Sequence, residues 1–96
     1  MDFKFDDSKN TACFVCDHVM LRQRPILYVT HEQEDGYWQF LCGNNDHTDV
    51  NIKIITMEEA TQIDNSINEL HEMPLGVGAE RETIDSEWVP FKLPEE

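Results

Sequence analysis

The sequence predicts an α+β fold: a small, mainly antiparallel sheet with a central hairpin, accompanied by two short helices. Segments rich in β-branched and aromatic residues stand on both sides of the middle of the chain, and such residues favour strands. Between them lie two patterns typical of helix starts, and strands, short helices and further strands in that order indicate the α+β class. The 96 residues fit a single domain, residues 1–96.

The central hairpin is predicted from residues 25–31 and 37–42, which are rich in strand-forming side chains. The Asp-Gly pair at positions 35–36 is a strong signal for a two-residue turn, and in that register Val29 faces Cys42. Alternation along each strand then places six residues on the more apolar face: Leu27, Val29, His31, Trp38, Phe40 and Cys42. The core is expected to combine the apolar members of this face with Ile52, Ile54, Leu70 and Trp88.

Two short helices are predicted from local capping patterns. Thr56, followed three residues later by Glu59, forms a capping box, so a helix of about two turns is expected to end near Ile63. The pattern recurs at residues 66–69, which predicts a second short helix. This helix should end before Pro74, because the residue before a proline is biased away from helical geometry.

The remaining strands are predicted from composition. Residues 51–55 read as a third strand, and residues 79–84 and 87–93 as two more. Pro90 confines the last strand to a sheet edge, because proline has no N–H to donate to a neighbour. Residues 1–11 are polar apart from two phenylalanines and predict a loose N-terminal arm or a short edge strand.

The charge balance restricts the classes of partner. The chain has 20 Asp and Glu against 7 Lys and Arg, a formal net charge of −13. Such a surface repels phosphate backbones and anionic membranes, so neither nucleic acid nor membrane is an expected partner. A basic protein is the natural electrostatic match. The alternative is that the charge mainly keeps the protein soluble and apart from its neighbours.

The start of the chain and the cysteine content predict a cytoplasmic protein. The first seven residues carry acids where a secretory signal would carry bases, and no apolar segment follows them. No apolar run approaches the roughly 20 residues that span a bilayer. The chain has 3 cysteines, an odd number, and without an export signal a disulfide framework is not expected.

The Cys-x-x-Cys pair at positions 13 and 16 is the strongest candidate for a chemical site. Two thiolates at this spacing can approach one metal ion from a tight knuckle, and a structural zinc ion needs four nitrogen or sulfur ligands. The predicted Cys₃His ligand set is Cys13, Cys16, Cys42 and His47, with His18 or His31 as substitutes for the histidine.

Each candidate has a competing interpretation. Cys42 lies on the apolar face of the hairpin, and a free cysteine is among the most frequently buried residues. The histidines can equally be surface or core residues. A redox dithiol is less favoured, because Asp17 follows the pair and an adjacent carboxylate raises a thiol pKa. No nucleophile or acid–base set stands out, so no catalytic residue is assigned and the protein is not expected to be an enzyme.

Two segments carry a resemblance to known proteins. Residues 35–43, Asp-Gly-Tyr-Trp-Gln-Phe-Leu-Cys-Gly, and residues 70–81, which contain Pro-Leu-Gly and Ala-Glu-Arg, resemble small bacterial proteins similar to a domain of unknown function grouped with immunity proteins of toxin systems. The resemblance spans roughly residues 13–92 and brings no catalytic residues. It implies a protein-interaction domain of immunity or inhibitor type. The Cys13–Cys16 pair lies outside the shared pattern, so a small zinc-binding domain is the alternative function.

Overall fold

The computed structural model describes residues 3–43 and 52–93 and shows a mixed α/β fold built on one six-stranded sheet. The strands are β1 Ala12–Cys16, β2 Tyr28–His31, β3 Trp38–Leu41, β4 Ile52–Thr56, β5 Val77–Glu80 and β6 Val89–Lys92. The helices are α1 Asp17–Met20, α2 Met57–Ile63 and the 3₁₀ helix η2 Asn65–Leu70. The strand order is β4-β1-β3-β2-β5-β6. Only the β1–β3 pairing among these is parallel, so the sheet is mainly antiparallel, as the sequence predicts.

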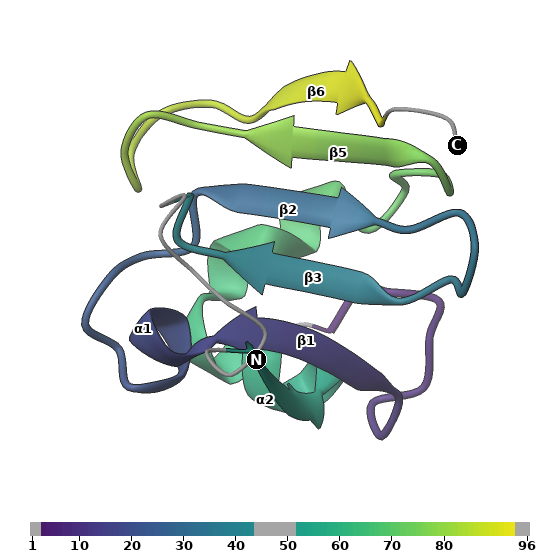
Figure 1. Cartoon of the computed structure of the whole chain (residues 1–96), viewed down its shortest axis with the longest axis horizontal. Helices are drawn as coiled ribbons and strands as arrows, with labels where there is room; N and C mark the ends of the chain where they lie inside the picture. Colours follow the sequence, from purple (N-terminus) through teal and green to yellow (C-terminus); the bar gives the residue numbers. More distant parts are fainter. Residues whose placement is uncertain (1–2, 44–51, 94–96) are drawn as a thin grey trace.

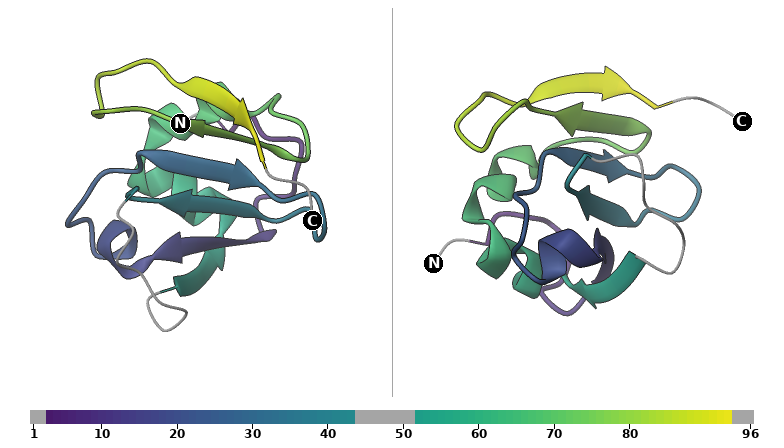
Figure 2. Two further views of the ribbon diagram at one scale, coloured as in Figure 1. Left: turned by 45° about the horizontal axis from the view of Figure 1, so that its top comes forward. Right: turned by 60° about the vertical axis from the view of Figure 1, so that its left-hand side comes forward.

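The helices cover one face of the sheet. The segment that contains α2 and η2, coloured teal to green, lies behind the strands in Figure 1 and on the same side in both views of Figure 2. The core fills the space between this layer and the sheet. Its buried apolar side chains are Phe5, Cys13, Val15, Cys16, Val19, Ile26, Val29, Trp38, Phe40, Cys42, Ile55, Met57, Ala60, Ile67, Leu70 and Ala79. No helix in the described part of the chain is long and apolar enough to cross a membrane.

The hairpin forms, but its turn is longer than the two residues predicted. Val29 lies opposite Phe40, and the Glu32 amide donates to the Tyr37 carbonyl oxygen at 2.9 Å. Gly36 has the positive φ of +74° that favours glycine, but it closes a longer loop by donating to the Glu32 carbonyl oxygen. The register is therefore shifted by two residues, and an even shift leaves every side chain on its predicted face.

Trp38 lies at the centre of the core. Its ring stacks on the His31 ring, with centroids 3.9 Å apart, and meets the edge of Phe5 at 4.9 Å. Its Nε1 donates to Asp7 Oδ1 at 3.2 Å. The N-terminal segment thus contributes a buried phenylalanine to the core. The prediction for Ile54 is wrong: this side chain is 67% exposed, because its pairing opposite Phe14 of β1 places it on the face away from the helices.

The capping box is confirmed. Thr56 Oγ1 accepts from the Glu59 amide at 3.1 Å, Glu59 Oε1 accepts from the Thr56 amide at 3.2 Å, and α2 ends at Ile63. The second helix is present, but it starts earlier than predicted and is 3₁₀ rather than α. Asp64 caps it by accepting from the Ser66 amide at 2.9 Å, so Ser66 lies inside the first turn.

Arg81 joins the last strands to the helical layer. Its side chain is 2% exposed, and its Nη2 donates to Asp64 Oδ2 at 2.8 Å and to the Ile26 carbonyl oxygen at 2.9 Å. Its guanidinium also lies over the Trp88 ring at 4.0 Å. Beyond this residue β6 forms the edge of the sheet, which is where Pro90 is tolerated.

Candidate metal centre

The Cys-x-x-Cys pair lies in strand β1 rather than in a knuckle. Three residues of extended strand separate positions 13 and 16 by roughly 10 Å along the chain. Cys13 lies in the core beside β4, opposite Ile55. Cys16 is the last residue of the strand and the N-cap of α1. Cys13 is not among the residues whose ligand atoms converge with that of Cys16, which argues against both a shared metal ion and a Cys13–Cys16 redox pair.

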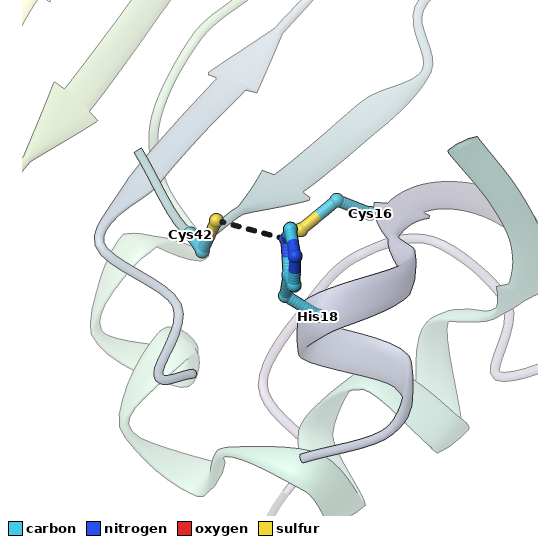
Figure 3. A group of neighbouring side chains, drawn as sticks. All are labelled: Cys16, His18 and Cys42. Atoms are coloured by element: carbon cyan, nitrogen blue, oxygen red, sulfur yellow. Dashed lines mark hydrogen bonds between the residues drawn. The ribbon is translucent and has the colours of Figure 1, made fainter. Parts of the chain in front are cut away.

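The parallel pairing of β1 and β3 builds a different cluster. Val15 lies opposite Phe40 and the two strands run in the same direction, so their carboxyl ends lie side by side at one end of the sheet. Cys16 at the end of β1, His18 in α1 and Cys42 after β3 therefore meet there (Figure 3). Their potential ligand atoms all lie within 4.8 Å of one another, and Cys42 Sγ is 3.8 Å from His18 Nδ1.

These separations are close to those of a tetrahedral zinc site. With Zn–S bonds of about 2.3 Å and Zn–N bonds of about 2.0–2.1 Å, tetrahedral angles place two sulfurs about 3.8 Å apart and a sulfur and a nitrogen about 3.6 Å apart. The observed sulfur–nitrogen distance is 3.8 Å, and no pair in the cluster exceeds 4.8 Å. Side-chain movements of about 1 Å would bring all three atoms onto one ion. The donor set, two soft sulfurs and an imidazole, suits zinc.

The surroundings of the cluster combine a buried and an accessible side. Cys16 is fully buried and Cys42 is 6% exposed, whereas the His18 side chain is 24% exposed. Burial raises the pKa of the Cys16 thiol, and hydrogen bonds from the Val19 and Cys42 amides partly oppose this rise. Arg24 Nη1 approaches Cys42 Sγ to 4.0 Å, which places a positive charge beside a sulfur that must be anionic to bind metal.

Cys13 has the environment of a core residue. Burial, followed by the negative charges of Glu59 and Asp7, raises its pKa from 9.0 to about 12. The side chain therefore stays a neutral thiol at physiological pH and behaves as a small apolar group. It is not among the three residues whose ligand atoms converge.

The other histidines have different environments. His31 stacks on Trp38, and its Nδ1 lies 2.9 Å from the Met73 carbonyl oxygen, so this half-buried ring packs against the core. His47 lies outside the described residues. His18, named from sequence as a substitute, is the histidine that joins the two cysteines. The signal for it is the Cys-x-His spacing at the point where a strand gives way to a helix.

Comparisons with protein-family models, with curated proteins and with solved structures find no match to this chain. Function must therefore be inferred from the chemistry of the chain itself.

Proposed function

We propose that the protein is a small zinc-binding domain whose ion is held by Cys16, His18 and Cys42. The convergence of two sulfurs and an imidazole nitrogen within 4.8 Å carries this proposal. Zinc is favoured over magnesium or calcium, because those ions prefer all-oxygen ligands whereas zinc takes thiolate and imidazole.

The proposed role of the ion is structural. It would tie the end of β1 and the four-residue helix α1 to the end of β3. A helix this short has little stability of its own, and zinc binding energy becomes folding energy where the site forms only in the folded state. Structural zinc sites have four protein ligands. The fourth ligand that the sequence predicts is His47, five residues beyond Cys42.

Zinc content of purified variants tests the proposal. Untagged protein from zinc-supplemented medium should contain one zinc per chain, and Cys16→Ala and Cys42→Ala should lose it. Cys13→Ala is the matched control, since it also removes a buried thiol but should keep the ion. If the cysteine variants fail to fold, His18→Gln still tests the site. This side chain is partly exposed, so its replacement should weaken zinc binding in a protein that remains folded. A metal-free wild-type protein would overturn the proposal.

A second function is proposed from the charge. The net charge of −13 and the resemblance to immunity proteins support a non-enzymatic interaction domain that binds a basic protein. Such a field accelerates association by about 10- to 10³-fold, and salt should reduce this effect. Pull-downs at low and high salt test it: a basic partner should be retained only at low salt. Equal retention of the partner at low and high salt, or the absence of any basic partner at low salt, would contradict this proposal.

A further inference from the structure

An apolar groove lies between the 3₁₀ helix η2 and strands β5 and β6, of which β6 is the edge strand. It has a volume of about 480 Å³. Buried Leu70 and Ala79 contribute to its floor, and the half-buried Met73, Val77 and Trp88 add further apolar surface. Pro90 of β6 also lines the groove. Because proline has no N–H, the outer side of β6 is a poor template for an added strand. The groove is therefore a better docking surface than the strand edge.

The rim of this groove is acidic. Glu69, Glu72 and Glu87 line it, and all three are exposed. Glu72 pairs with His71, with 3.4 Å between its Oε1 and the imidazole Nε2. Glu69 and Glu87 have no ion-pair partner among residues 3–43 and 52–93. Apolar surface framed by carboxylates complements a chain that carries both alkyl groups and positive charge.

We infer that this groove binds a lysine- or arginine-bearing segment of a basic protein partner. This inference rests on the proposed partner class and names the surface that recognises it. Long cationic side chains bury their methylene stems on apolar surface while their charged ends stay at the water boundary. Here the stems would lie against Leu70, Val77 and Trp88, and the charged ends would reach Glu69 and Glu87 at the rim.

The groove and the charge of the whole chain can be tested separately. The probe is a short peptide of alternating lysine and leucine, titrated into the intact protein at low salt while its amide NMR spectrum is followed. The groove variant is Glu69→Gln with Glu87→Gln. The matched control is Glu58→Gln with Glu80→Gln, which changes the net charge equally. Glu80 follows buried Ala79 on β5 and so points to the opposite face of the sheet, and Glu58 lies in α2.

The groove variant should weaken peptide binding by about three- to tenfold relative to the control, as expected for the loss of two exposed ion pairs. Shifts should concentrate at Leu70, Val77 and Trp88, and replacing leucine by serine in the peptide should also weaken binding. Equal weakening in both variants, or shifts centred elsewhere, would overturn the groove while leaving the basic-partner proposal standing. No binding at low salt would overturn both. None of these outcomes depends on whether the protein binds zinc, so the peptide experiment is independent of the zinc proposal.

Discussion

The assignment of Cys13 to the core predicts a loss of stability at alkaline pH. Its pKa is raised from 9.0 to about 12 in the folded protein, mainly by burial. In the unfolded chain the thiol ionises near its ordinary value, so between these two pH values the unfolded state binds fewer protons than the folded state. The neutral Cys13 thiol therefore makes its full contribution to stability below about pH 9. Above that pH the free energy of unfolding falls by about 1.4 kcal/mol per pH unit. The loss should approach 3 kcal/mol by about pH 11.

Urea unfolding followed by tryptophan fluorescence measures this loss against a Cys13→Ala control. The variant lacks the thiol and should be less stable than wild type by about 1–2 kcal/mol near neutral pH, because it leaves a small cavity. Other alkaline titrations, including that of Cys16, occur in both proteins and cancel in the difference. The advantage of the wild type should disappear as pH rises and then reverse. A difference that stays constant from about pH 7 to about pH 11 would refute the assignment of Cys13 as a buried neutral thiol.

Two further predictions concern the core and its buried ion pair. Trp38→Ala should lower the free energy of unfolding in urea by about 3–5 kcal/mol, since the ring is 1% exposed and packs on three aromatic rings; a loss below about 1 kcal/mol would contradict this packing. Arg81→Ala should cost about 3–5 kcal/mol by leaving Asp64 unpaired in a site where that side chain is 10% exposed. Combining it with Asp64→Ala should recover part of the loss, and strictly additive costs would contradict the pairing.

The elements predicted correctly are those specified by neighbours in sequence. The capping box of Thr56 and Glu59 needs three residues of chain, and α2 forms where it predicts. The edge position of Pro90 follows from its missing N–H. The hairpin turn was predicted less well, because the local Asp-Gly signal competes with the Glu32–Tyr37 backbone pairing, which closes a longer loop.

Strand β1 shows why the rest could not be predicted. Its partners are β3 and β4, which lie far along the chain, and its parallel pairing with β3 has no local signature. Without that strand the Cys13–Cys16 spacing suggests a knuckle, whereas an extended backbone places the two residues roughly 10 Å apart along the chain. The same long-range pairing brings Cys16 beside Cys42 and selects His18 as the third group of the cluster. The cysteines and histidines of the sequence therefore predict a metal site, but the pairing of the strands determines which of the cysteines lie close together.

Zinc K-edge X-ray absorption of the purified holoprotein tests the central claim most directly, because it counts the sulfurs bound to the ion. The arrangement of Cys16, His18 and Cys42 predicts two sulfurs at about 2.3 Å and the remaining ligands nitrogen or oxygen, with at least one nitrogen at about 2.0–2.1 Å. The Cys13→Ala protein should give the same spectrum. A shell of three sulfurs that falls to two in Cys13→Ala would show that Cys13 binds the ion, and would contradict the site described by Cys16, His18 and Cys42.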